Sequence, residues 1–390
     1  VFRSADRGLS WTAISDDLTD NQSRDEIVTM GLKGSDIRIS RNDGDNISEI
    51  SNFAESPIDP KVLWVGTDDG NVQLTIDGGT TWNEVSGNIS GVASGTFVGD
   101  IVASAASRGT AYVSFDAHRD GDFAPYLFKT TDFGKTWAKI SDDLTTNDPE
   151  KQKQEQSGGV TVDNSAAEMH TTIYAIAESP KNGNVIWVGT DDGNVQVTRD
   201  GGKTWTNVVG NVRGVPKNAW VSYIDAGRFA EGTAFVAFDA HMFGDMKPYV
   251  YKTEDFGKTW TSVIPAGSPV RGFAHVVKQD LVNNDLLFVG TEFGLWVSLD
   301  GGKQWAQYKG GDLPSVAVRD LDDVAGRAAE DPVVGCAETA EQQGAARDIG
   351  GERSAERDRP HRDIHHILGP PAASGSTSVS PSAASASAIA

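Results

Sequence analysis

Short apolar runs separated by turns rich in Gly and Asp recur along the first 321 residues. Within residues 172–209 four such runs read TIYAIAES, VIWVGT, NVQVTR and TWTNVV. Runs of this length that are rich in β-branched and aromatic residues, and are bounded by turn residues, are typical of β-strands. Residues 221–264 repeat the same order as VSYIDA, TAFVAFD, PYVYKT and TWTSVI. The pattern therefore predicts units of four consecutive short strands.

One motif, [S/T]-x-D-x-G-x-x-W, lies between the third and fourth run of each unit. Its copies contain Asp6 and Trp11, Asp77 and Trp82, Asp132 and Trp137, Asp200 and Trp205, Asp255 and Trp260, and Asp300 and Trp305. Gly adopts positive φ without strain, and an Asp carboxylate accepts backbone N–H groups in a tight turn. The Trp begins the next strand and buries a large ring. We therefore assign these residues a structural role.

The units are of two alternating types. Residues 62–82 recur with few changes at 185–205, and residues 109–137 recur at 232–260, so that both copies lie 123 residues further on. A looser copy of the first type occupies residues 286–305. Four-stranded units that repeat in this way indicate the blades of a β-propeller. We predict an all-β chain with five near-complete blades, preceded by strands three and four of a further blade, which gives five to six blades in total.

The propeller pattern extends over residues 1–321, where SVAVRDL (315–321) is expected to be a lone first strand. Residue 1 is Val, and the first motif begins at Ser4, so we interpret the chain as a fragment that is incomplete at its N-terminus. After residue 321 Phe, Trp, Tyr and Lys no longer occur. We predict that residues 322–390 form a low-complexity, disordered tail, because they cannot bury enough apolar surface to fold as a blade. A shift of reading frame is the other origin that we consider for this tail.

The repeats resemble BNR, or Asp-box, repeats. The segments GTDDGNVQVTRDGGKTW, KPYVYKTEDFGKTW and GTEFGLWVSLDGGKQW carry this resemblance, which covers residues 1 to about 321. Such repeats occur in sialidases, in the sortilin/VPS10 ectodomain and in xyloglucanase-type glycoside hydrolases. The chain most resembles the large bacterial sortilin-like or "BNR-repeat glycosyl hydrolase" proteins. The resemblance implies a propeller and a secreted or periplasmic location, but Asp-boxes support enzymes and non-enzymes alike.

Composition limits the classes of ligand. The formal net charge is −21, and phosphate binding needs clustered Lys and Arg, so we predict no nucleic-acid partner. No run of eighteen apolar residues occurs, so we predict no membrane insertion. A single cysteine, Cys336, excludes an internal disulfide framework and a Cys-based zinc site. We predict neither a cofactor nor a bound metal.

The candidate site lies on the face opposite the Asp-box turns. In a four-stranded blade the connection between strands 2 and 3 and the connection from strand 4 to the next blade share that face, and long loops on a rigid scaffold are where function usually lies. Two long connections, roughly 16–47 and 142–170, are expected there. The predicted ligand-binding residues on this acidic face are Asp68, Asp116, His118, Asp122, Asp191, Trp220, Asp239, His241 and Asp245.

The pattern D-A-H-x-x-G-D occurs at residues 116–122 and again at 239–245. Asp and His at this spacing can ligate a divalent cation. They can equally bond the loop backbone and hold a wide hairpin. We favour the second interpretation, because the motif is copied with the blade.

Two functions are compatible with this sequence. The first is a non-catalytic scaffold that binds a protein, a peptide or a glycan on the acidic face. The alternative is a glycoside hydrolase of xyloglucanase type, which needs two carboxyl groups flanking the scissile bond. Xyloglucanase-type activity would be expected to need a second propeller. A sialidase is disfavoured because the sequence offers no arginine cluster for the substrate carboxylate. The sequence identifies no catalytic residue, ligand or oligomeric state.

Overall fold

The computed structural model describes most of the propeller pattern. The described residues are 1–6, 8–23, 28–29, 32–33, 48–118, 121–153, 170–309 and 316–323, with short strands at 333–335, 366–367 and 386–389. These residues contain strands and three short 3-10 turns, with no α-helix among them. No helix within these ranges is long and apolar enough to cross a membrane.

Five sheets of four antiparallel strands follow one another along the chain, and we call them blades I to V. Blade I contains β5 (Ile50–Glu55), β6 (Leu63–Thr67), β7 (Val72–Thr75) and β8 (Asn83–Glu84). Blade II contains β9 (Phe97–Ala103), β10 (Ala111–Asp116), β11 (Tyr126–Thr130) and β12 (Ala138–Lys139). Blade III contains β13 (Ile173–Ser179), β14 (Asn182–Thr190), β15 (Val195–Thr198) and β16 (Thr206–Asn207). Blade IV contains β17 (Trp220–Ala226), β18 (Ala234–Asp239), β19 (Tyr249–Thr253) and β20 (Thr261–Ser262). Blade V contains β21 (Ala274–Gln279), β22 (Leu287–Thr291), β23 (Gly294–Ser298) and β24 (Ala306–Gln307).

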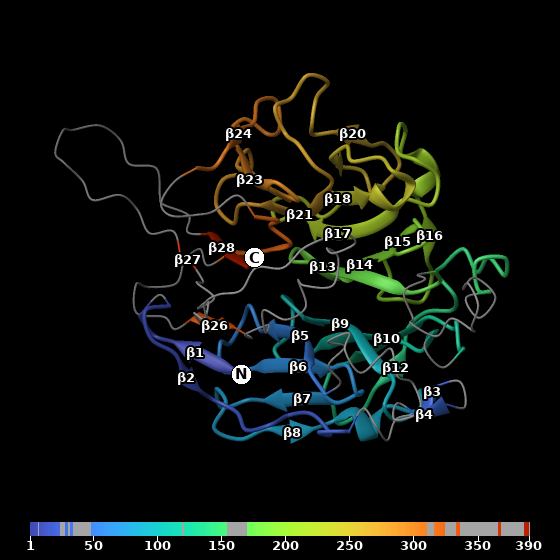
Figure 1. Ribbon diagram of the computed structural model, residues 1–390, viewed down its shortest axis with the longest axis vertical. Coiled ribbons are helices and arrows are strands. Elements are labelled where there is room, and N and C mark those ends of the chain that lie inside the picture. The colour runs from blue at the N-terminus through green and yellow to red at the C-terminus, as the bar shows by residue number, and fades with distance from the viewer. Residues whose placement is uncertain are drawn as a thin grey trace, which may run out of the picture.

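The blades are arranged around a common axis, which confirms the predicted β-propeller. Figure 1 shows the first strands of the blades near the centre and the fourth strands toward the periphery. The first strands contact one another in blade order, from β5 to β9, β13, β17 and β21. A three-stranded sheet of β2 (Thr12–Ala13), β1 (Phe2–Ser4) and β26 (Val333–Gly335) lies beside blade I in Figure 1. The predicted strands three and four of an N-terminal blade are β1 and β2, in which Phe2 pairs with Ala13.

The lone first strand predicted at 315–321 begins further along the chain than predicted. It is β25 (Asp320–Asp323), which pairs with β28 (Ala386–Ile389) in a sheet that also contains β27 (His366–Ile367). The preceding residues cross the end of β22 instead, where the Val318 N–H donates to the Thr291 carbonyl at 3.0 Å. A separate hairpin joins β3 (Val28–Thr29) and β4 (Leu32–Lys33). Most of the 322–390 tail lies outside the described residues, so its predicted disorder stays a prediction.

Neighbouring blades are held together by large buried rings. Trp187 on β14 is fully buried and packs edge-on against Trp260 of blade IV, with ring centroids 6.1 Å apart. Trp64 on β6 and Trp137 of blade II form the same pair at 6.0 Å. At Gly189 an added Cβ would lie 2.3 Å from Val221 of the next blade, so the sheets approach too closely there for any larger residue. The repeated sequence thus produces a repeated interface between blades.

The turns that carry the [S/T]-x-D-x-G-x-x-W motif, which we call the motif turns, repeat one hydrogen-bond pattern. In blade III the Thr198 hydroxyl donates to Asp200 Oδ1 at 2.8 Å, and the Thr204 N–H donates to the same oxygen at 2.9 Å. Hydrogen bonds from Thr204 and Thr198 lower the pKa of Asp200 to about 2. The indole of Trp205 donates to the Ile140 carbonyl at 2.9 Å and so ties blade III to blade II. Related Asp bonds occur at Asp6, Asp77, Asp132, Asp255 and Asp300.

Candidate functional site

The nine predicted ligand-binding residues all lie on the face opposite the motif turns, and we call this face the upper face. Asp68 and Asp191 follow the second strands of blades I and III, and Asp116 and Asp239 end the second strands of blades II and IV. Trp220 begins β17, where the connection from blade III enters blade IV. His118, Asp122, His241 and Asp245 lie in the connections between the second and third strands.

Asp68 and Asp191 bind the backbone at the end of the two long connections. Asp191 Oδ1 accepts the Thr172 N–H at 2.9 Å, and Asp68 Oδ1 accepts the Glu49 N–H at 2.7 Å. These bonds hold each connection where it enters the first strand of its blade. The two positions are equivalent in the repeat, and both have a structural partner.

The second Asp of each GTDDGN segment binds the other end of the same connection. Asp192 Oδ2 accepts the N–H and the hydroxyl of Thr146, each at 2.7 Å. Asp69 Oδ2 accepts the Asp20 N–H at 2.8 Å in the equivalent place. The long connections are therefore fastened to the upper face by carboxylates at both ends.

The D-A-H-x-x-G-D segments form local hydrogen bonds, as the favoured interpretation expects. Asp116 Oδ1 accepts the His118 N–H at 3.0 Å and lies 2.5 Å from His118 Nδ1. Asp122 Oδ2 accepts the Tyr126 hydroxyl at 2.5 Å. Blade IV repeats both contacts with Asp239, His241, Asp245 and Tyr249. In the part of the chain that the structure describes, no three His, Cys, Asp or Glu side chains are grouped to hold a metal ion.

Several side chains of blades II to V interact in pairs on the upper face, and we call them together the rim cluster. Its members are Asp116, Asp191, Tyr174, Trp220, Asp239, His275 and Glu292. The rings of Tyr174 and Trp220 meet edge-on with centroids 4.4 Å apart, and 44% of Tyr174 is exposed. Trp220 pairs with Asp239 across β17 and β18. The cluster therefore presents aromatic surface directly beside carboxyl groups.

Blade V contributes His275 and Glu292 to the rim cluster. His275 Nε2 lies 3.0 Å from Glu292 Oε2, and the ring of Phe273 meets the His275 ring edge-on at 4.7 Å. The His241 ring of blade IV stacks on the Phe273 ring, with the two ring centroids 4.6 Å apart. Burial lowers the pKa of His275, although the bond to Glu292 opposes this shift.

One carboxyl group of the rim cluster holds its proton near neutral pH. Burial raises the pKa of Asp191 to about 7, the hydrogen bond from Thr172 opposes the shift, and the charges of Asp192 and Asp116 add to it. Among the described residues, no group bonds Asp191 Oδ2. Asp100, on β9, also has a pKa raised to about 7 by burial. The upper face and the first strand of blade II thus each carry a carboxyl group whose pKa is raised to about 7.

These two groups predict a stability that depends on pH. Asp191 and Asp100 bind their protons more tightly in the folded chain than in the unfolded chain, where an Asp titrates near its ordinary pKa. The stability from this difference is fully present below about pH 4 and is lost as the pH rises through about 7. We expect the free energy of unfolding, measured in urea, to decrease across this window. Asp191→Asn and Asp100→Asn should each flatten the decrease, and an unchanged slope in both variants would contradict the assignment.

Sequence reasoning missed part of the rim cluster. Tyr174, Phe273 and His275 lie in or beside the first strands, which were interpreted only as strands. Asp100 lies in FVGDIVA, a strand that is otherwise largely apolar. A polar residue that interrupts such an inner strand was the available signal. Glu292 follows the second strand of blade V and pairs with His275, which no spacing along the chain indicates.

No family model matches the chain. An oligoxyloglucan-reducing end-specific xyloglucanase of Emericella nidulans is 24% identical over 298 residues, which cover 69% of this chain and 33% of that protein. A probable oligoxyloglucan-reducing end-specific xyloglucanase of Neosartorya fischeri is 24% identical over 290 residues, which cover 69% of this chain and 32% of that protein. The chain therefore spans about a third of the length of these curated relatives.

Solved structures of similar fold include enzymes of the GH74 type. The Niastella koreensis GH74 enzyme matches with a TM-score of 0.47 and 19% identity, over 67% of this chain and 38% of that chain. The Xanthomonas campestris GH74 xyloglucanase matches with a TM-score of 0.47 and 18% identity, over 68% of this chain and 39% of the other.

Proposed function

We propose that the chain is the propeller of a glycoside hydrolase that acts on xyloglucan or a related β-glucan, with the rim cluster as its sugar-binding site. The similarity to two xyloglucanases along 69% of the chain is the observation that carries this proposal. It favours the hydrolase over the non-catalytic scaffold. The BNR or sortilin-like resemblance adds nothing to this choice, because Asp-boxes occur in both classes.

The geometry of the rim cluster supports a sugar ligand. Tyr174 and Trp220 offer aromatic surface against which the apolar face of a sugar ring can pack. Glu292 of blade V lies on the same face and can accept hydrogen bonds from sugar hydroxyls, while Asp239 pairs with Trp220 across the sheet. A polysaccharide substrate also fits export from the cell, and we propose a secreted or periplasmic location on that ground.

Within this proposal, Asp191 is the general acid and Asp116 is the second carboxyl group. Hydrolysis needs one carboxyl group that is protonated and one that is not. Asp191 supplies the first, because its pKa is raised to about 7, and the charge of Asp116 contributes to that rise. Only 7% of Asp191 is exposed, so substrate must shift the adjacent end of the connection to reach Oδ2. Thr171 in that end has a φ of 73°, an unfavourable conformation for a residue with a branched side chain.

The proposal places both carboxyl groups on this one propeller, which departs from the expectation that a second propeller is needed. It is therefore tested by reducing-sugar release from xyloglucan by the purified 390-residue chain. We expect release that declines as the pH rises above about 7, because Asp191 then loses its proton. Cellulose and a sialylated glycan serve as comparison substrates. If xyloglucan is bound without release of reducing ends, the scaffold function is supported instead, and if it is neither bound nor cleaved, the proposal is wrong.

A further inference from the structure

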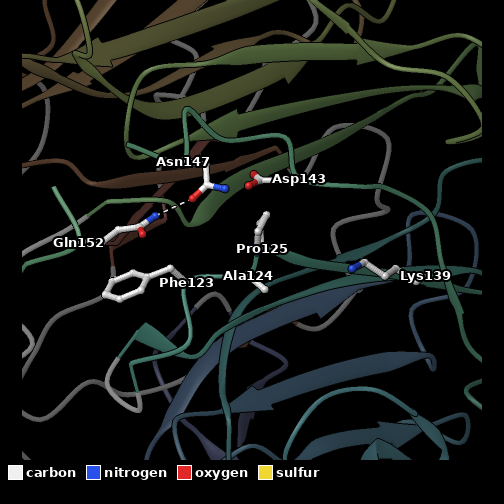
Figure 2. Close-up of a pocket in the computed structure, with 7 residues that line it drawn as sticks. All are labelled: Phe123, Ala124, Pro125, Lys139, Asp143, Asn147 and Gln152. Carbon is white, nitrogen blue, oxygen red and sulfur yellow. Dashed lines mark hydrogen bonds between the residues drawn. The ribbon is translucent and has the colours of Figure 1, made fainter. Parts of the chain in front are cut away.

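A recess on the upper face lies between blade II and the connection that leads to blade III. Its volume is about 380 Å³, and we call it the II/III pocket. Its lining residues are Phe123, Ala124, Pro125, Lys139, Asp143, Asn147 and Gln152. Figure 2 shows Asn147 and Asp143 on one side of the pocket and Ala124 and Pro125 on the other. None of these residues belongs to the rim cluster.

We propose that the II/III pocket is an accessory binding site for a sugar unit of a neutral glycan. This ligand class rests on the proposed function, but the binding itself is independent of hydrolysis. The volume lies at the lower end of the roughly 300–1,000 Å³ that is usual for small-ligand sites. The pocket thus fits a short piece of a glycan chain rather than a folded partner.

The apolar wall of the pocket is fixed by the last Asp of the D-A-H-x-x-G-D motif. Asp122 Oδ1 accepts the Ala124 N–H at 2.9 Å, and Asp122 Oδ2 accepts the Tyr126 hydroxyl at 2.5 Å. These two bonds span the residues on either side of Pro125, which is buried. The half-buried ring of Phe123 stands at one end of this wall and offers a surface for the C–H face of a sugar.

The polar wall is fixed to blade III. The Leu144 carbonyl accepts the side-chain amides of Asn194 at 3.0 Å and of Gln196 at 2.9 Å. Two residues further on, Thr146 is bound by Asp192 at 2.7 Å. Asp143 and Asn147 flank this fastened stretch, so they are presented by a rigid segment although they are exposed. Such preorganisation lowers the entropic cost of binding.

The polar groups that line the pocket can bind the hydroxyl groups of a ligand, and together they favour neither a positively nor a negatively charged ligand. Asn147 Oδ1 accepts the Gln152 amide at 2.8 Å, which leaves the Asn147 amide nitrogen as a donor and the Gln152 amide oxygen as an acceptor. Asp143 holds Thr145 through Oδ1 alone, so Oδ2 can accept from a ligand. Lys139 adds one positive charge, which balances the charge of Asp143. A neutral ligand rich in hydroxyls fits this arrangement better than an acidic or a basic one.

The repeat supplies a matched comparison within the same chain. Blade IV carries Met246, Lys247 and Pro248 where blade II carries Phe123, Ala124 and Pro125. The connection that follows blade IV, residues 263–273, is much shorter than residues 140–172 after blade II. Blade IV therefore has the equivalent wall without the long polar connection that faces it.

The test is calorimetric titration of the full chain with xyloglucan oligosaccharides of increasing length. Phe123→Ala removes the ring, and Asn147→Gly removes the amide while Gly tolerates the φ of 47° at this position. We expect each variant to weaken binding of the longer oligosaccharides about 5- to 10-fold, as the loss of one ring contact or one hydrogen bond implies. Met246→Ala should leave the affinity unchanged.

The outcomes separate this proposal from the hydrolase. If neither Phe123→Ala nor Asn147→Gly changes the affinity while xyloglucan is still cleaved, the pocket proposal is overturned and the hydrolase stands. If both weaken binding and no reducing ends are released, the pocket stands and the hydrolase falls. An equal loss of affinity in Met246→Ala would also overturn the pocket, because it would show a general effect of truncation on this face.

Discussion

Asp191→Asn lowers the rate of reducing-sugar release from xyloglucan by about 10²- to 10⁴-fold, the usual contribution of a general acid or base. The amide has nearly the shape of the protonated carboxyl group and can still accept the Thr172 N–H. The variant should therefore fold normally and lose only the transferable proton. Asp116→Asn removes the second carboxyl group of the proposal, and we expect a loss in the same range. The measurement is the initial rate at saturating substrate, with the thermal midpoint of each variant recorded alongside.

Glu254→Gln is the control for this prediction. Glu254 is a highly exposed residue of the motif turn of blade IV, on the face opposite the rim cluster, and it pairs with Lys252 at 2.8 Å. The rate of reducing-sugar release by the Glu254→Gln variant should match that of the unmodified chain. If a folded Asp191→Asn variant keeps its full rate, Asp191 is not the general acid. Asp100 would then be the carboxyl group to substitute next.

The fold could be predicted from the sequence because every blade contains the same turn motif between its third and fourth strands. The turn that contains Asp200, Gly202 and Trp205 recurs nearly unchanged in every unit, so one structural interpretation applies to all six copies. The exception was the strand placed at 315–321. Its apolar alternation is real, but Val318 is used to bond Thr291 and the strand begins at Asp320.

The rim cluster was only partly readable, because its members come together across blades. The upper face follows from the order of strands, so Asp116, Asp191 and Trp220 could be placed on it from sequence. Which of them adjoin one another depends on how the first strands converge, and no spacing along the chain contains that information. The raised pKa of Asp191 is a consequence of burial, which a motif shared with the equivalent Asp68 could not reveal.

Trp187→Ala lowers the free energy of unfolding by about 3–5 kcal/mol, as expected for truncating a fully buried aromatic side chain in a packed core. The loss includes the edge-on contact with Trp260 of the next blade. In the described part of the chain Trp187 Nε1 is buried without a hydrogen-bond partner, so Trp187→Phe forfeits no bond and should cost clearly less. Urea unfolding followed by circular dichroism measures both values.

The equivalent residue in blade I makes this prediction a test of the interface itself. Trp64 is also fully buried, its Nε1 also has no partner among the described residues, and it meets Trp137 of blade II in the same geometry. If contact between blades stabilises the propeller, Trp64→Ala and Trp187→Ala should cost similar amounts. A loss below about 1 kcal/mol in both would mean that each blade is stabilised mainly within its own sheet, because truncating a tightly packed ring would otherwise leave a costly cavity.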